Sequence, residues 1–460
     1  MPDLRPYQVR AVDAVRRHIQ QGAKAPLLVS PTGSGKTVIL AHVAASAVGK
    51  RRRVVIVAHR GELVSQISAA LDAAGVAHGI IAPWARPNPF PAVQVASVAT
   101  LAKRPMVPHC DLLIIDEAHH VTPGNTWGKV REALAPRHTL GLTATPVRTD
   151  GTGLGQVFDA LEVVTTTAEL VETGYLARPV VYAPATLPDL GGVQRVAGDY
   201  NRGQLGKVMG TAAITGDAVA HYRRLCPDVQ AIAFGVSLEH CTAIADQFQT
   251  AGIPAAVVDG RMAATDRAGV LDAFRRGAVR VLVSCELIGE GFDVPACGAA
   301  ILLRPTQSLG LYLQQVGRAL RPAPGKTRAV ILDHAGNTLR HGLPTDDREW
   351  SLEGDETAQR RGKKDPDAAP VWQCLACYAY TPSRERECEA CGEARPFMGR
   401  EVEVEAGELV EIQAPPRRPA DPERGKARTL AQLEAIERAR GYKAGWARHV
   451  FAARQRKMGG

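Results

Sequence analysis

The stretch LLVSPTGSGKTVILA, residues 27–41, determines how the first part of the chain folds. A run of apolar residues ends at a Gly-rich turn, and Lys36 and Thr37 then open a segment that is typical of a helix. This order of strand, turn and helix is that of a phosphate-binding loop. The usual loop begins with glycine, whereas this one begins with Ser30. The stretch alone therefore predicts nucleotide binding and leaves open how the nucleotide is used.

Each part of this loop, residues 30–37, suits the binding of phosphate. Backbone N–H groups around Gly33, Ser34 and Gly35 are expected to point at phosphate oxygens, next to the partial positive charge of the helix N-terminus. Lys36 is expected to bridge the β and γ phosphates of ATP, and Thr37 to bind Mg²⁺. A Gly-rich surface turn is the alternative, and the buried strand directly before TGSGKT argues against it.

The sequence LLIIDEAHH, residues 112–120, supplies the acidic half of a nucleotide site. Asp116 is expected to hold Mg²⁺ through water, and Glu117 to polarise the attacking water as a general base. Two acidic residues at a solvated strand end are the alternative. Their position after the apolar run LLII, in a chain with a phosphate loop, favours the catalytic interpretation.

Short apolar runs alternate with helical patterns in the first 145 residues, and a second such set follows after a break. Continuous hydrophobicity predicts strands covered on both faces, hence parallel sheets wrapped by helices. We therefore expect an α/β protein with two domains of this kind in tandem. The predicted segments are 1–165 (first domain, ATP-binding), 166–216 (linker and insertion), 217–345 (second domain), 371–396 (cysteine module) and 427–460 (basic helical tail).

The charge of the chain is unevenly placed. Residues 424–460 contain ten Lys or Arg and two Glu, a net charge of +8. This is nearly all of the chain's net charge of +9. A polyanion such as nucleic acid is therefore expected first at this tail. We find no apolar run of about 18 residues and no export signal, so the sequence predicts a cytoplasmic protein without a membrane span.

Four motifs together resemble motifs I, II, III and VI of superfamily 2 helicases: SPTGSGKT (30–37), DEAH (116–119), TAT (143–145) and QQVGRALR (314–321). The resemblance covers about residues 4–335, and in that superfamily the loop commonly begins with Ala or Ser. It implies two RecA-like domains and an ATP-hydrolysing enzyme. It also implies that Arg318 and Arg321 reach across the interdomain cleft to the γ-phosphate as arginine fingers.

The same resemblance assigns further nucleotide contacts. LRPYQ, residues 4–8, would recognise adenine through Gln8. CELIGEGFDVP, residues 285–295, resembles motif V, in which Gly291 and Asp293 would contact the nucleotide.

Contacts to a nucleic-acid strand are also implied by the resemblance. Arg60 in motif Ia would lie near the strand's backbone, and Ser97 and Thr100 in motif Ib would donate to phosphates. Such contacts carry little sequence information, as expected of a translocating motor. The alternative for Arg60 is that it caps a strand end.

Four cysteines form two CxxC pairs separated by ten residues: Cys374, Cys377, Cys388 and Cys391. This spacing suits a tetrahedral Zn²⁺ site with four thiolates, and the absence of an open position indicates a structural metal. Disulfides are the alternative and are disfavoured in the cytoplasm. The module could contact DNA, or dock onto a protein partner or the motor itself.

The tail is expected to form two short helices around Gly441 with arginines outside. It would bind the duplex backbone, or dock as a hairpin on the second domain.

Within superfamily 2, the chain is similar to RadD-type and phage DEAD/DEAH-box helicases. This similarity favours a DNA-dependent ATPase that unwinds or remodels DNA in repair, recombination or phage replication. An RNA helicase is a second interpretation. A third is an adaptor whose nucleotide state switches partner binding through the zinc module.

Overall fold

The computed structural model of the 460-residue chain consists of two units, Met1–Gln413 and Ala414–Gly460, which are described separately. The residues that the structure describes are 3–148, 152–183, 193, 195–196, 199–200, 205, 212–285, 297–353, 371–373, 380–382, 410–412, 429–440, 445, 447–448 and 451.

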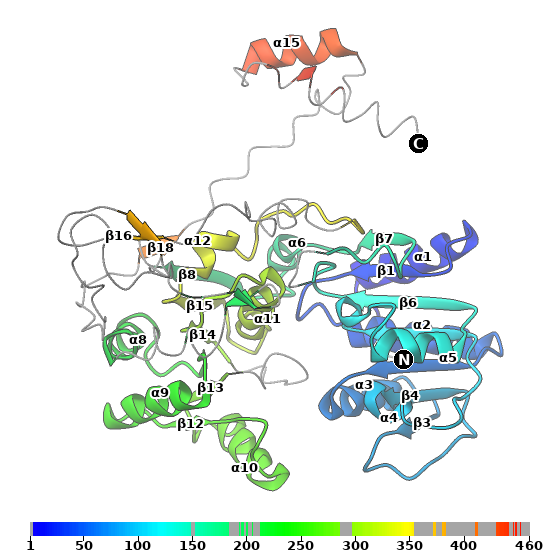
Figure 1. The fold of residues 1–460 in the computed structure, drawn as a ribbon, viewed down its shortest axis with the longest axis horizontal. Coiled ribbons are helices and arrows are strands. Elements are labelled where there is room, and N and C mark those ends of the chain that lie inside the picture. Colours follow the sequence, from blue (N-terminus) through cyan, green and yellow to red (C-terminus); the bar gives the residue numbers. More distant parts are fainter. Residues whose placement is uncertain are drawn as a thin grey trace. The chain divides into compact units, whose positions relative to one another are not determined.

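The first domain is built on a sheet of parallel strands wrapped by helices (Figure 1). Its strand order is β3 (His78–Ile81), β4 (Val93–Ser97), β2 (Val54–Ala58), β5 (Leu112–Asp116), β6 (His138–Thr143), β1 (Pro26–Val29) and β7 (Ala160–Val163). Its helices are α1 (Pro6–Gln20), α2 (Lys36–Gly49), α3 (Gly61–Ala73), α4 (Val98–Leu101), the 3-10 turn η1 (Ala118–His120) and α5 (Thr126–Leu134).

The inner strands of this sheet are buried on both faces, which explains their continuous hydrophobicity. In β1, Leu28 packs into one apolar cluster, whereas Leu27 and Val29 pack into the cluster on the opposite face. Successive side chains of a strand point to opposite faces, so both faces require apolar residues. The inner strands are therefore mainly apolar, and Ser97, Asp116 and Thr143 are the last residues of β4, β5 and β6.

The second domain repeats this plan. Its strand order is β12 (Ala255–Val257), β13 (Val281–Ser284), β11 (Ala231–Phe234), β14 (Ala299–Leu302), β15 (Arg328–Asp333), β8 (Arg178–Ala183) and β18 (Val410–Ile412). Its helices are α8 (Ala212–Leu225), α9 (Leu238–Thr250), α10 (Ala264–Arg275), α11 (Leu309–Leu320) and α12 (Asn337–His341). The strands are parallel except for β18, which pairs antiparallel with β8. The predicted α/β class with two parallel sheets is confirmed.

The stretch 166–216 differs from a simple linker and insertion. It contains α6 (Thr167–Glu172), and its strand β8 pairs in parallel with β15 inside the second sheet. The prediction that the second domain begins at residue 217 is therefore wrong for this strand. The run RPVVYA forms this strand, and the prolines on both sides of VVYA made the sequence look like a linker. The hairpin β9 (Arg195–Val196) and β10 (Asp199–Tyr200) follows β8.

Two short elements lie beyond the second domain. The hairpin β16 (Val371–Gln373) and β17 (Tyr380–Pro382) flanks part of the predicted cysteine module. In the second unit, α15 (Leu430–Arg440) occupies the place of the first expected tail helix, and its Leu433 and Ile436 pack with Ala447. Gly441 lies outside the described residues.

Candidate nucleotide and nucleic-acid site

The phosphate loop connects β1 to α2, and two of its glycines adopt a backbone conformation that other residues rarely reach. Gly33 has φ +88° and Gly35 has φ +81°. Gly35 is also the N-cap of α2, and no side chain caps this helix N-terminus. Within the described residues the N-cap therefore supplies no side-chain acceptor to the first N–H groups of α2, which is the arrangement of an anion-binding site.

Ser30 has a structural role at the start of the loop. Its hydroxyl donates to the hydroxyl of Ser34 over 2.7 Å, and both side chains are buried. The Ser30 backbone carbonyl lies 3.3 Å from the Nζ of Lys36. Serine at this position therefore ties the entrance of the loop to its middle, a contact that glycine cannot make.

Gln8, predicted to recognise adenine, lies against the phosphate loop. Its Nε2 donates to the Ser34 carbonyl over 3.2 Å, and its Oε1 accepts from the Arg5 backbone N–H. Tyr7, which the sequence interpretation missed, donates to the same Ser34 carbonyl over 2.6 Å. Burial raises the pKa of Tyr7, so its hydroxyl stays protonated as a donor. Nothing in the sequence marks Tyr7 beyond its place beside Gln8.

The acidic pair lies where β5 ends. Asp116 is the last residue of the strand, and its Oδ1 accepts from the Glu117 backbone N–H over 3.1 Å. Glu117 has φ +51°, a conformation that costs a non-glycine residue roughly 1–2 kcal/mol. Arg51, Ala135 and Asp228 share a positive φ, so this conformation alone does not mark a site, but at residue 117 it sets the direction in which the carboxylate leaves the strand end.

The TAT motif connects the acidic pair to the second domain. The Thr143 hydroxyl lies 3.0 Å from Nδ1 of His119 and donates to the Thr145 carbonyl over 2.8 Å. Thr145 in turn faces α11, because a Cβ atom added to Gly310 would lie 2.8 Å from its Oγ1. A continuous set of contacts thus runs from the DEAH segment to the helix that carries Arg318.

Helix α11 lies directly on the phosphate loop. A Cβ atom added to Gly317 would lie 2.6 Å from the Cβ of Thr32, and one added to Gly33 would lie 3.6 Å from the Cγ of Arg321. Arg318 is 6% exposed. A cavity of about 50 Å³ is lined by the loop and α11 together. The structure therefore brings α11, with the predicted arginine finger Arg318 and with Arg321 directly after the helix, onto the predicted nucleotide site.

Lys326 is a second residue that the sequence interpretation missed. Its Nζ donates to the backbone carbonyls of Ala319 and Arg321, at the end of α11, and to that of Cys297. Burial lowers the pKa of Lys326 to about 8. This side chain fixes the turn that carries Arg321, and no motif signals it in the sequence.

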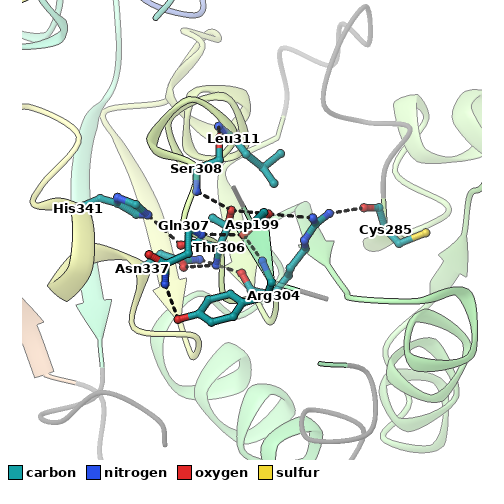
Figure 2. A network of polar contacts seen from close by, with 10 residues as sticks. Asp199, Cys285, Arg304, Thr306, Gln307, Ser308, Leu311, Asn337 and His341 are labelled. Carbon is teal, nitrogen blue, oxygen red and sulfur yellow. Dashed lines mark hydrogen bonds and ion pairs between the residues drawn. The ribbon is translucent and has the colours of Figure 1, made fainter. Parts of the chain in front are cut away.

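A buried polar network holds the other end of α11 (Figure 2). Asp199 of β10 accepts from Arg304 over 3.2 Å, from the Thr306 hydroxyl over 2.9 Å and from the Gln307 backbone N–H over 2.7 Å. Ser308 then caps α11 by accepting from the Leu311 N–H. The hairpin β9–β10 is thereby attached to the residues that start α11.

The residues predicted to contact a nucleic-acid strand share one edge of the first sheet. Arg60 follows β2 and is the N-cap of α3, whose N-terminus has no side-chain cap. Ser97 ends β4 and Thr100 lies in α4, and β4 pairs in parallel with β2 so that Ser97 aligns with Ala58. The structure therefore brings these three residues to the same edge.

A larger cavity of about 270 Å³ lies elsewhere, between α1, α2 and the strand starts at Leu112 and His138. Cavity size therefore does not mark the nucleotide site, which follows the carboxyl ends of the strands.

Several predicted residues lie outside the described part of the chain. They are Gly291, Asp293 and the four predicted zinc ligands Cys374, Cys377, Cys388 and Cys391. Among the described residues, no group of three or more His, Cys, Asp or Glu side chains is arranged to hold a metal ion. No described helix has the length and apolar character needed to span a membrane.

Two family models match the chain. Residues 1–148 match "Type III restriction enzyme, res subunit", and residues 220–323 match "Helicase conserved C-terminal domain". These matches fall on the first and second α/β domains respectively.

Three relatives are similar over much of the chain. A 51.5 kDa protein of a Lactococcus phage is 34% identical, over 80% of this chain and 77% of its own length. The candidate ATP-dependent helicase IRC3 of Saccharomyces cerevisiae is 28% identical, over 73% of this chain and 52% of its own. The DNA 3'-5' helicase XPB of Kineococcus radiotolerans is 27% identical, over 69% of this chain and 57% of its own length. The chain thus spans little more than half of the two named helicases.

The fold also resembles a solved structure, a fragment of a candidate HsdR subunit of a type I restriction enzyme from Vibrio vulnificus. The TM-score is 0.58 at 21% identity, covering 74% of this chain and 65% of that one. Two helicase domain models in order, a phosphate loop and helicase relatives agree with the motif pattern. The chain belongs to the superfamily 2 helicases and is an ATP-hydrolysing enzyme of that superfamily.

Proposed function

We propose that the protein is a DNA helicase or translocase in which closure of two RecA-like domains controls ATP hydrolysis. The observation that carries this proposal is the contact of α11 with the phosphate loop at Gly317 and Thr32. Because the loop and the arginines belong to different domains, a complete site exists only when the domains meet. ATP binding would favour this closed state, and hydrolysis would release it.

Each predicted residue has a role in this scheme. The N–H groups of the loop, with Lys36, hold the phosphates, and Glu117 activates water. Arg318 and Arg321 stabilise charge on the γ-phosphate, which is worth roughly 10³- to 10⁵-fold in rate for such arginines. The other proposed nucleotide contacts are Gln8, Gly33, Ser34, Gly35, Thr37, Gly291 and Asp293.

Magnesium fits the residues present. Thr37 offers a hydroxyl and Asp116 a carboxylate, and Mg²⁺ is usually held by one or two such oxygens together with substrate phosphates. When bound, the ion would neutralise charge on the β and γ phosphates.

DNA is the proposed substrate. The restriction-enzyme family model and the XPB relative support DNA over RNA. Arg60, Ser97 and Thr100 lie on one edge of the first sheet and would hold the backbone of a strand there. Contacts of this kind position the protein without reading sequence, which suits movement along DNA.

The test is ATP hydrolysis measured with single-stranded DNA, duplex DNA, forked DNA and RNA. We expect DNA to raise the rate, and Glu117→Gln to lower the stimulated rate by roughly 10²- to 10⁴-fold, as for loss of a general base. Stimulation by RNA alone would indicate an RNA helicase. Hydrolysis that no nucleic acid changes would indicate a nucleotide-switched adaptor.

The remaining assignments are proposals that accompany this function. They are a RadD-like or phage-type helicase in the cytoplasm, a role in DNA repair, recombination or phage replication, a structural Zn²⁺ on the four cysteines, and a protein partner at the zinc module or tail. Chelation tests the zinc: a four-cysteine protein should release one equivalent of metal and lose structure around residues 371–396. A protein that contains no zinc as purified, and binds none when it is added, would contradict the assignment.

A further inference from the structure

An exposed tryptophan lies in the turn that follows β3. The turn is closed by a hydrogen bond from the Ala85 N–H to the Ala82 carbonyl over 3.2 Å. Pro83 occupies its second position, where proline restricts the backbone to the conformation that the turn requires. Trp84 occupies the third position and is 57% exposed. A large aromatic side chain is thus held outward on a restricted backbone.

The indole ring of Trp84 packs on the first residue of α3. A Cβ atom added to Gly61 would lie 2.7 Å from the Cη2 atom of the ring, so the ring lies against the backbone of Gly61 and would have to turn away from a larger residue there. Gly61 directly follows Arg60. The tryptophan is therefore fixed beside a residue that is proposed to hold a nucleic-acid backbone.

Sheet topology places Trp84 on the same edge as the proposed strand contacts. Strand β4 lies between β3 and β2, and all three are parallel. Trp84 follows the carboxyl end of β3, as Arg60 follows that of β2 and Ser97 ends β4. Arg60, Ser97 and Trp84 thus all lie at the carboxyl ends of three neighbouring strands, on one edge of the sheet.

This combination fits an unpaired base better than other occupants. The bases of single strands offer flat apolar faces that stack on aromatic side chains, while their phosphates require cations. Arg60 directly precedes the glycine that the ring contacts, with its Nε donating to His59 Nε2 over 3.2 Å, and Arg86 is exposed two residues after Trp84, so an arginine lies close in the chain to each side of this contact.

We propose that Trp84 stacks on an unpaired base of the nucleic-acid strand whose backbone lies along Arg60, Ser97 and Thr100. This inference rests on the proposed function. It adds a contact to a base, whereas Arg60, Ser97 and Thr100 are proposed to contact only the backbone of the strand. It also makes the protein prefer unpaired over duplex substrate at this position, because bases within a duplex are already stacked.

The same loop contains a matched control. Phe90 is 90% exposed, but its neighbours lie near the starts of the strands: the Pro89 carbonyl accepts from Arg53, and the Pro91 carbonyl accepts from Gln94. Arg53 directly precedes β2, and Gln94 is the second residue of β4. Phe90 is thus an exposed aromatic residue of the same loop at the opposite edge.

The experiment measures the affinity of the full chain for fluorescent oligothymidylate and for an abasic strand of equal length. We expect Trp84→Ala to weaken oligothymidylate binding roughly 5- to 150-fold, the range for one base stacked on an aromatic side chain. Trp84→Phe should recover part of this loss. Binding of the abasic strand should not change, and Phe90→Ala should bind both strands as the parent protein does.

Salt dependence separates stacking from a lost phosphate contact. The slope of affinity against salt concentration should be equal for Trp84→Ala and the parent, because no phosphate contact is removed. Equal oligothymidylate affinity for both proteins would overturn the inference, as would an equal loss on the abasic strand. If the parent protein binds no nucleic acid and none stimulates its ATPase, the proposed function itself is wrong.

Discussion

Gly317 of α11 and Thr32 of the phosphate loop are in direct contact across the two α/β domains. The contact requires glycine, because a Cβ atom on residue 317 would lie 2.6 Å from the Cβ of Thr32 and 2.8 Å from its Cγ2. The Cβ position of Thr32 is set by its backbone, so rotation of the side chain cannot relieve this contact. Packing, and not only the two arginines, therefore sets how closely α11 approaches the nucleotide site.

Gly317→Ala should impair hydrolysis while leaving the domains folded. The added methyl group must displace α11 or the loop, and misplacement of catalytic groups by about 1 Å can reduce the rate by roughly 100-fold. We expect the kcat for ATP hydrolysis to fall at least tenfold. The control is Gly269→Ala in α10, where nothing lies within 4 Å of the added atom. This control should keep the parent's kcat; an equal kcat in Gly317→Ala would contradict the argument.

Tyr7→Phe should weaken ATP binding. The substitution removes the hydroxyl that donates to the Ser34 carbonyl over 2.6 Å and leaves Gln8 as the remaining side-chain donor to that atom. Loss of one such hydrogen bond costs roughly 1 kcal/mol, which is about a fivefold change in affinity. The affinity can be measured by titration with a fluorescent ATP analogue. An unchanged dissociation constant would show that the loop keeps its shape without Tyr7.

The parts of the site that were predictable from the sequence are those made of adjacent residues. The phosphate loop and the DEAH segment each follow one strand directly. The positions of their residues relative to that strand can therefore be predicted from the sequence alone. Tyr7 and Trp84 were not found, because their partners Ser34 and Gly61 lie more than twenty residues away and only folding brings them near. Lys326 was not found because its acceptors are backbone carbonyls, which no sequence pattern marks. The strand β8 was missed for a related reason, since its place beside β15 depends on a pairing across some 150 residues.

Asp199→Ala should destabilise the second domain strongly. The substitution leaves the guanidinium of Arg304, whose side chain is 6% exposed, without its carboxylate partner. Removing one partner of a buried ion pair typically lowers the free energy of unfolding by about 3–5 kcal/mol. Urea unfolding followed by circular dichroism would measure the loss. Asp13→Ala is the control, because its pair with Arg16 is exposed on both sides and should contribute less than about 1 kcal/mol.

A double substitution separates the pair from other effects of Asp199. If the cost comes from an unpaired buried charge, then adding Arg304→Ala to Asp199→Ala should destabilise the protein less than the two single losses combined. Fully additive losses would mean that the carboxylate acts mainly through Thr306 and the Gln307 N–H.

His240 should make the stability of the second domain depend on pH. Burial lowers the pKa of this imidazole to about 4, and its Nδ1 accepts from the Val236 N–H. The unfolded chain binds a proton near pH 6.5, whereas the folded protein does not until about pH 4. The contribution of His240 to the free energy of unfolding is therefore fully present above pH 6.5. It is lost as the pH falls toward 4, by up to roughly 1.4 kcal/mol per pH unit. His240→Gln keeps an acceptor but cannot titrate. Urea unfolding between pH 7.5 and 4.5 should show a shallower loss of stability in this variant, and coincident pH profiles would assign the acid sensitivity to other groups.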